Sequence, residues 1–390
     1  MNYTLTTERR TEYRIISREA HLAKKNALAG NGPKPVYSIN KPKLDPKKLM
    51  PQLPLNNLRA LSLFSGGGGL DLGFDRAGYT HVASYDWLKI CGDTIKFNRP
   101  NWSVFSGDID GDVRNVNWSV YKGKVDVIHG GPPCQPFSIA GSQKGSRDER
   151  NMWPEFIRAV NTIKPKVFVA ENVPGMLNAK FRDFIKFEII KKLPDYYITY
   201  FKISSAMFGV PQDRQRVIFV GFRNKKHADV YKQPPQTHTY AHLKKKRGVT
   251  DSNQTSLFED FENKERTVGV REALGLEDIG CDALAPTIRS AFTGKRNTTS
   301  ILNGKSGQEY WANLKIWPNG VAENREAAMN FVPKNMHRRL SVQDCAILQG
   351  FPSDWIFQGA VYKILGQIGN SVAPPKGYAI ARSILEALKN

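Results

Sequence analysis

A cysteine that follows a stiff glycine–proline turn is the residue of this chain best suited to chemistry. Residues 125–138 have the sequence VDVIHGGPPCQPFS, in which an apolar run ends in two glycines, two prolines and Cys134. Proline cannot donate to a sheet ladder, so the thiol follows the end of a buried strand. A lone cysteine is usually a small buried hydrophobe, which is our interpretation of Cys91, Cys281 and Cys345. Cys134 is instead a candidate nucleophile, with a Gly/Ser-rich segment after it that could close over a substrate.

A carboxyl group and two arginines also lie at or beside the ends of predicted strands. The stretch VFVAENV ends a predicted strand in Glu171, and a carboxyl group in a partly dry site can donate a proton near neutral pH. The stretch QDRQRV puts Arg214 and Arg216 on one side of a strand, since strand side chains alternate. Two guanidinium groups there suit phosphate or an anionic base edge and could activate a thiol. Each has an alternative explanation without a catalytic role. Glu171 would be a salt-bridged acid at a strand end, and the two arginines would belong to a solvated strand edge.

A glycine loop and the acids after it indicate a nucleotide-like ligand. Residues 61–74, LSLFSGGGGLDLGF, predict a strand, a glycine turn and a helix, which together let a ligand approach the backbone. Asp86 ends the next predicted strand, where a carboxylate can accept from ribose hydroxyls, and Trp87 can face an adenine. Asp108 follows a third strand. The dinucleotide fingerprint lacks its last glycine, which argues against a nicotinamide oxidoreductase.

The elements that must position these side chains alternate between short apolar runs and amphipathic ones. This alternation predicts an α/β fold with a parallel sheet covered on both faces. The predicted strands are RALSLFS, HVASYDW, VDVIHGG, VFVAENV and RVIFVGF; the predicted helices are GLDLGFDRAG, ICGDTIKFN, WPEFIRAVNTI and FRDFIKFEIIKKL.

Four regions follow from this pattern. Residues 1–57 form a basic N-terminal extension, with a helix over 7–28 and a Pro-rich extended linker over 32–54. Residues 58–222 are the first part of the catalytic domain, and residues 223–337 are a module inserted into it. Residues 338–390 complete the domain with helices, of which one is capped by Ser341 and the last starts at paired prolines.

The composition of the chain favours one class of binding partner and argues against several kinds of structural site. The chain carries 57 Lys and Arg against 36 Asp and Glu, a net charge of +21, which favours nucleic acid over an unspecific solvated surface. No apolar run approaches the length of a membrane span, and the N-terminus lacks an apolar signal core. The four cysteines form no CxxC pair, so we expect no metal site, no disulfide framework and a reducing interior.

Taken in order, the motifs identify a family. FSGGGG, YDW, GDI, GGPPCQPFS, ENV, QDRQR, RRLSVQDCAILQGFP and QIGNSVAPP resemble the motifs of DNA (cytosine-5)-methyltransferases over residues 59–222 and 338–390. The resemblance implies a Rossmann-like, S-adenosylmethionine-dependent methyltransferase domain with a mostly parallel sheet. It also implies that the smaller inserted module, residues 223–337, is the target-recognition domain.

The resemblance assigns the chemical roles. Cys134 matches the nucleophile that attacks C6 of a cytosine flipped out of duplex DNA, because neither C5 nor C6 is reachable within stacked DNA. Glu171 matches the acid at N3. Arg214 matches the arginine that contacts the base carbonyl, and Arg216 a supporting position. Ser138, in the same motif as the thiol, is expected to contact DNA.

The same resemblance assigns the cofactor-binding residues. Asp86 stands where glutamate is usual, which shortens its reach, and Gly67 stands where a larger residue is common, which would loosen a cofactor contact. The assigned residues are Phe64, Gly66, Gly68 and Gly69 for the methionine side, Asp86 for the ribose, Trp87, Asp108 and Ile109 for the adenine, and Asn370 and Val372 from the far end of the chain.

The inserted module is expected to read the DNA sequence. Arg289, Lys295 and Arg296, in APTIRSAFTGKRN, follow Thr287–Ile288, which resembles a pair common in such modules. The expected protein is a bacterial or archaeal modification enzyme of a restriction–modification system, cytoplasmic and monomeric on double-stranded DNA.

Two other functions use the same scaffold. A tRNA cytosine-5 methyltransferase shares the thiol chemistry, but its Cys-Phe-Thr signature is absent from the sequence. An inactive DNA-binding regulator would not need to retain Cys134, Glu171 and Arg214 together.

Overall fold

A seven-stranded sheet forms the centre of the chain in the computed structural model, which describes residues 7–31, 38–133, 151–243, 264–288, 299–301, 304–330, 333 and 335–389. The strand order is β3-β2-β1-β4-β5-β8-β6. The strands are β1 (Arg59–Leu63), β2 (Thr80–Asp86), β3 (Val104–Ser106), β4 (Val127–Gly130), β5 (Val167–Asn172), β6 (Tyr197–Ser204) and β8 (Gln215–Phe222). The predicted α/β fold with a mostly parallel sheet is confirmed.

The first five strands in chain order are parallel, and the last two are not. β8 runs antiparallel to β5, and β6 runs antiparallel to β8 at the edge of the sheet. The prediction missed β6, because only Phe201, Ile203 and Ser204 of this edge strand are buried and it lacks a continuous apolar run. The parallel order reverses between β1 and β4, which is where open α/β sheets bind ligands.

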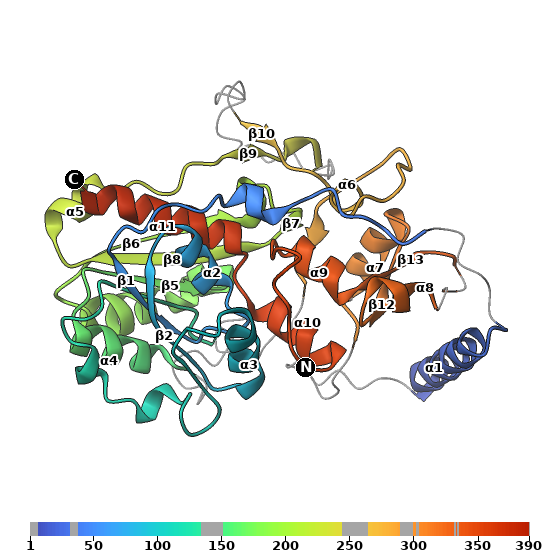
Figure 1. Ribbon diagram of the computed structural model, residues 1–390, viewed down its shortest axis with the longest axis horizontal. Helices are drawn as coiled ribbons and strands as arrows, with labels where there is room; N and C mark the ends of the chain where they lie inside the picture. Colours follow the sequence, from blue (N-terminus) through green and yellow to red (C-terminus); the bar gives the residue numbers. More distant parts are fainter. Residues whose placement is uncertain are drawn as a thin grey trace.

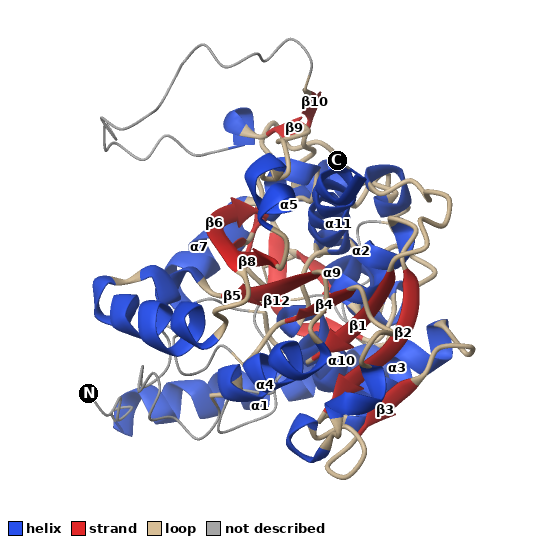
Figure 2. Cartoon of the chain, turned by 90° about the vertical axis from the view of Figure 1, so that its left-hand side faces the viewer, coloured by secondary structure: helices blue, strands red, loops and turns tan. Residues whose placement is uncertain are grey.

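Helices cover both faces of the sheet, as Figure 2 shows. On one face α2 (Gly69–Arg76) and α11 (Pro374–Lys389) pack over Val169, Ile218 and Val220. On the other face α4 (Trp153–Ile163) packs over a second apolar cluster. α3 (Lys89–Asn98) lies beside β2 and β3. The predicted helix over 181–193 is a π-helical turn, Phe184–Ile189, followed by a 3₁₀ turn, Ile190–Lys192.

The chain after β8 leaves the sheet and returns to it. β7 (Gln212–Asp213), just before β8, pairs with β11 (Ala285–Pro286) of the inserted region. The other elements here are α5 (Lys225–Val230), β9 (His238–Thr239), β10 (Glu265–Arg266), α6 (Val270–Ala273), α7 (Gly304–Asn313), β12 (Ile316–Ala322), α8 (Arg325–Met329), β13 (Arg338–Ser341), α9 (Val342–Leu348) and α10 (Val361–Asn370). Ser341 caps α9 in a capping box with Asp344, as predicted from the sequence.

The N-terminal region is a helix followed by a packed strap. α1 (Thr7–Leu28) has the predicted bounds and lies apart from the sheet (Figure 1). Residues 38–57 are extended, apart from a 3₁₀ turn at Pro46–Leu49, but they are packed. The Asn40 side chain donates to Leu274 O near α6, and Arg76 of α2 donates to Met50 O. In the described part of the chain no helix is long and apolar enough to cross a membrane.

Candidate active site

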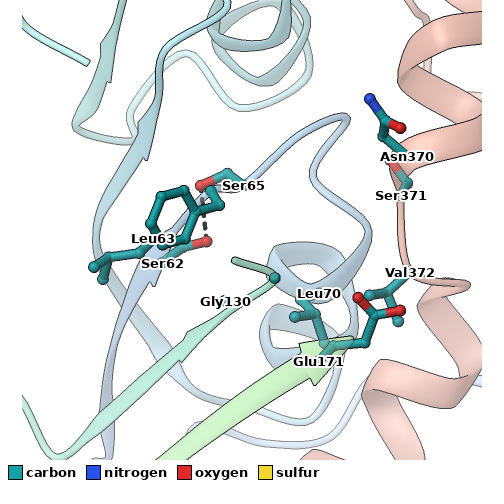
Figure 3. Close-up of a pocket in the computed structure, with 11 residues that line it drawn as sticks. Ser62, Leu63, Ser65, Leu70, Gly130, Glu171, Asn370, Ser371 and Val372 are labelled. Carbon is teal, nitrogen blue, oxygen red and sulfur yellow. Dashed lines mark hydrogen bonds between the residues drawn. The ribbon is translucent and has the colours of Figure 1, made fainter. Parts of the chain in front are cut away.

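A pocket opens at the carboxyl ends of the central strands, beside the point where strand order reverses. Figure 3 shows its lining, which joins residues from both ends of the chain. Four of the residues predicted from the sequence meet in it, namely Phe64, Glu171, Asn370 and Val372. The other lining residues are Ser62, Leu63, Ser65, Leu70, Gly130, Gly131 and Ser371.

The glycine loop of this pocket is held closed by the C-terminal part of the chain. Gly67 N donates to Ser371 Oγ, and Trp355 Nε1 donates to Gly67 O. A Cβ on Gly67 would lie 2.7 Å from Ser371 Oγ and 2.8 Å from the ring of Phe357. Ser371 and Phe357 thus fill the space that a larger residue at 67 would need, while the looser cofactor contact expected for glycine stays a prediction.

The next two glycines are required by close approach. A Cβ on Gly69 would lie only 2.0 Å from Val372 O, so α2 can start against the C-terminal segment only with glycine there. Gly68 adopts a left-handed φ of 81° as the residue before α2, and its Cβ would meet Trp355. The loop therefore has little freedom to change shape.

Asp86 fastens the loop to the end of β2. Its carboxylate accepts from Gly66 N and from Leu88 N, both at 2.8 Å. A carboxylate has about four lone-pair positions, so these two bonds leave capacity for further donors. The shorter aspartate thus reaches the loop backbone and stays available to a ligand.

The predicted adenine-side residues lie outside the pocket lining but at neighbouring strand ends. The Trp87 ring is 59% exposed, and the Arg114 guanidinium stacks over it at 5.3 Å. Asp108 and Ile109 are exposed in the turn after β3. Gly111 lets this turn approach Asp86 O, from which a Cβ would be 2.1 Å. An exposed aromatic face and an apolar side chain are thus available beside Asp86.

Glu171 ends β5 as a buried acid paired with an arginine. Arg216 Nε lies 2.8 Å from Glu171 Oε1, and both side chains are nearly buried. A Cβ on Gly131 would lie 3.3 Å from Glu171 Oε2, so the first residues after β4 run directly beside the carboxyl group. The neighbouring Asn172 donates to Pro132 O and ties the glycine–proline turn to β5.

The two arginines of QDRQR have different surroundings. Arg214 is 1% exposed and donates to Gly369 O at 2.8 Å and to Ile288 O at 3.5 Å. It thereby joins the catalytic sheet, the end of α10 and the inserted region. Arg216, which the sequence suggested as the supporting residue, is the arginine that contacts Glu171.

Three residues that sequence reasoning did not single out belong to this site. Ser371 Oγ accepts from the glycine loop, and Gln349 Nε2 donates to Ser371 O at 2.6 Å. Lys376, in the first turn of α11, is fully buried near Glu171 and both arginines. The sequence carried a signal for Lys376, since it precedes Ile380 and Ile384 at helical spacing and is the charged residue of an apolar stripe.

Several predicted residues lie outside the described ones: Cys134, Ser138, Arg289, Lys295 and Arg296. Their nearest described neighbours are well anchored. Thr287 Oγ1 donates to Asp213 O, and Ile288 N donates to Gln212 Oε1. The other cysteines are free thiols; burial raises the pKa of Cys91 and of Cys345, whereas Cys281 is exposed. No cluster of metal-binding side chains occurs among the residues that the structure describes.

Comparison with known proteins gives consistent matches over most of the chain. A family model for C-5 cytosine-specific DNA methylases matches residues 58–386. Type II methyltransferase M.NgoMIV of Neisseria gonorrhoeae is 32% identical over 335 residues, covering 85% of this chain and 98% of that protein. Type II methyltransferase M.PspPI of a Psychrobacter species is 32% identical over 348 residues, covering 86% and 80%. The solved structure of the Entamoeba histolytica methyltransferase EhMeth shares the fold, with a TM-score of 0.52, 16% identity and coverage of 85% and 99%.

Proposed function

Because the chain belongs to the C-5 cytosine-specific DNA methylases, and so is a DNA (cytosine-5)-methyltransferase, we propose that the strand edge around Glu171 receives a cytosine turned out of duplex DNA. A base within the stack exposes neither C5 nor C6, so it must leave the helix before it reacts. The proposal is carried by one observation: Glu171 lines the same pocket as Phe64, Ser65 and Leu70, which flank the glycine loop, and lies beside Gly131, three residues before Cys134.

The cofactor proposed for this pocket is S-adenosylmethionine, which supplies the methyl group when it is bound. The residues present fit such a molecule. The glycine loop offers backbone without side chains, Asp86 retains lone pairs for ribose hydroxyls, and Trp87 offers an exposed ring for adenine. Phe64, Asn370 and Val372 line the pocket nearest Glu171 and so would surround the methionine end.

In the proposed reaction the Cys134 thiolate attacks C6 of the cytosine. Glu171 donates its proton to N3 as the C6–S bond forms, and C5 becomes nucleophilic enough to take the methyl group. A water molecule takes the C5 proton, and the electron pair of that C–H bond restores the ring double bond as the C6–S bond breaks. The proton on N3 returns to Glu171, the thiolate is released and the product is 5-methylcytosine.

Arg216 is the better candidate for a direct role beside the base. Its guanidinium pairs with Glu171, orients that carboxyl group and leaves further N–H donors for the base carbonyl. Arg214 donates to the backbone at Gly369 and Ile288, so we propose that it also holds the two parts of the chain in register. Loss of Arg214 would then misplace the site.

The remaining proposals concern the biological context. The relatives at 32% identity are Type II methyltransferases, so we propose the modification enzyme of a restriction–modification system, acting in the cytoplasm as a monomer on double-stranded DNA. We assign sequence recognition to residues 223–337, because the residues of the sheet edge are committed to chemistry that is the same for every target cytosine.

The test uses Cys134→Ser, Glu171→Gln and, as a matched control, Cys281→Ser, which removes an exposed thiol elsewhere. Methyl transfer to DNA should be abolished in Cys134→Ser and about 10²–10⁴-fold slower in Glu171→Gln, with cofactor affinity retained. The wild type should form a denaturation-resistant adduct with DNA containing 5-fluorocytosine. An active Cys134→Ser variant, or an adduct mapped to another cysteine, would overturn the assignment of the nucleophile.

A further inference from the structure

Lys376 is a buried lysine that the reaction proposed above does not use. Its side chain has no exposed surface, and its Nζ has no hydrogen-bond partner among the residues that the structure describes. Burying an ammonium group without a partner costs several kcal/mol, so such a lysine is rare unless its environment changes its charge. The position of this amine therefore needs an explanation.

Helical and strand periodicity place Lys376 under the catalytic carboxyl group. Lys376 begins the stripe of α11 that continues with Ile380 and Ile384, both in the apolar core over the sheet. On the facing strands, Val169 and Ile218 belong to the same core. Glu171 ends the row of Val169, and Arg216 ends the row of Ile218, because strand side chains alternate. The chain just before α11 lies at the same end of the sheet, since Val372 lines one pocket with Glu171, and Glu171 and both arginines act on the charge of Lys376.

The charges around Lys376 favour its neutral form. Burial lowers the pKa of Lys376 well below its usual value; Glu171 opposes this shift, whereas Arg216 and Arg214 add to it. On the other side α2 presents Gly69 and Leu70, without charge, to the neighbouring Gly377. Since arginine stays protonated, a charged Lys376 would leave three cations around one carboxylate, and only the lysine can relieve that excess.

We propose that Lys376 is a positioning residue for Glu171, an amine beneath the carboxyl group whose own protonation decides whether Glu171 meets the cytosine as an acid or as a carboxylate. With the amine neutral, Glu171 can keep the proton that N3 requires. With the amine charged, the carboxylate form of Glu171 is favoured, and Glu171 then has no proton to donate to N3. The inference rests on the proposed role of Glu171.

The experiment is the pH dependence of single-turnover methyl transfer in the wild type and in Lys376→Met. Ile380→Met is the matched control, because it changes the same face of α11 one turn away without altering charge. Fitting the pH dependence of the rate should require one more ionisation for the wild type than for Lys376→Met. The pH dependence of Ile380→Met should match that of the wild type. Ionisation of Cys134 contributes equally to all three and cancels in the comparison.

A double-mutant cycle with Glu171→Gln separates a role through Glu171 from general packing. Lys376→Met should change the rate by about threefold or more in the wild-type background and leave it unchanged in the Glu171→Gln background. Removing an unpaired buried amine does not weaken packing, so the variant should melt no lower than the wild type; Lys376→Gln, equally uncharged, repeats the measurement.

Two results would separate the two proposals. Identical pH profiles for the wild type, Lys376→Met and Lys376→Gln, with Glu171→Gln still slow, would overturn the role of Lys376 alone. A Glu171→Gln variant as fast as the wild type would instead overturn the role of Glu171. Equal effects of Lys376→Met in both backgrounds would also reject action through Glu171.

Discussion

Replacing Asp71 with asparagine should make the protein more stable at neutral pH. Asp71 lies in the first turn of α2, is 2% exposed and accepts from Ser84 Oγ at 2.6 Å. Its Oδ2 has no hydrogen-bond partner among the described residues. Burial raises the pKa of Asp71 from 3.8 to about 6, against the opposing hydrogen bonds from Ser84 and Ser62. Asparagine keeps the shape and the acceptor but cannot ionise.

The sign and the size follow from this pKa. A folded-state value above the unfolded one means that the folded protein holds the proton more tightly. The stability contribution is fully present below pH 3.8 and is lost as the pH rises to about 6. The gap of about two units, at ~1.4 kcal/mol for each, corresponds to about 3 kcal/mol. Above pH 6 the wild type bears this cost and Asp71→Asn does not.

The assay is urea unfolding of both proteins from pH 4.5 to 7.5, with the difference in unfolding free energy plotted against pH. This difference should shift in favour of Asp71→Asn as the pH rises to about 6 and then stay level. Asp112→Asn is a control of opposite sign, because Arg114 holds the pKa of Asp112 below its usual range. The contribution of Asp112 is complete above pH 3.8, so Asp112→Asn should be less stable than the wild type by the same amount at every pH of the assay. A pH-independent difference for Asp71→Asn would refute the reasoning.

Two further predictions concern the cofactor loop and DNA recognition. Gly67→Ala should weaken S-adenosylmethionine binding about tenfold by calorimetry, because the new Cβ meets Ser371 and Phe357 and overpacking costs ~1–3 kcal/mol; an unchanged affinity would mean that the loop yields freely. Alanine at Arg289 or Arg296 should relax the methylated sequence at a defined base position, since a bidentate arginine–guanine contact contributes ~1–3 kcal/mol of discrimination. If genome-wide methylation profiles keep the parental motif and only the salt-dependent affinity falls, these arginines bind phosphate instead.

The strands that carry the site were predictable because each is a continuous apolar run ending in a functional residue. β1, β4 and β5 are buried along almost their whole length and β2 over Ala83–Tyr85, so their hydrophobicity is visible without alternation, and Asp86 and Glu171 interrupt it near the strand ends. The sequence pattern did not predict β6, because this strand lies at the edge of the sheet. The antiparallel direction of β8 was equally hidden, since strand direction depends on which neighbour the chain returns to.

Contacts between distant segments of the chain were beyond local sequence patterns. No local pattern indicates that Arg214 also donates to Gly369 and Ile288, 155 and 74 residues away, while its contact with the base stays a prediction. Similarly, residues 38–54 of the Pro-rich linker are mostly extended, as predicted, but no local pattern indicates that the Asn40 side chain donates to Leu274 O. Gly67 replaces the larger residue that is common at its position, and no local pattern indicates that Phe357 and Ser371 fill the space beside it.

The closure of the glycine loop by Trp355, Phe357 and Ser371 sets a condition on biosynthesis. The loop leaves the ribosome early, but the side chains that hold it are made almost 300 residues later. A nascent chain therefore has the strand for Asp86 and the strand for Glu171 well before it has a finished pocket. Premature termination anywhere before residue 372 should yield a protein without methylating activity, however complete its recognition module. Any enzyme that can act on DNA has therefore already completed residues 223–337, the module proposed to read the sequence.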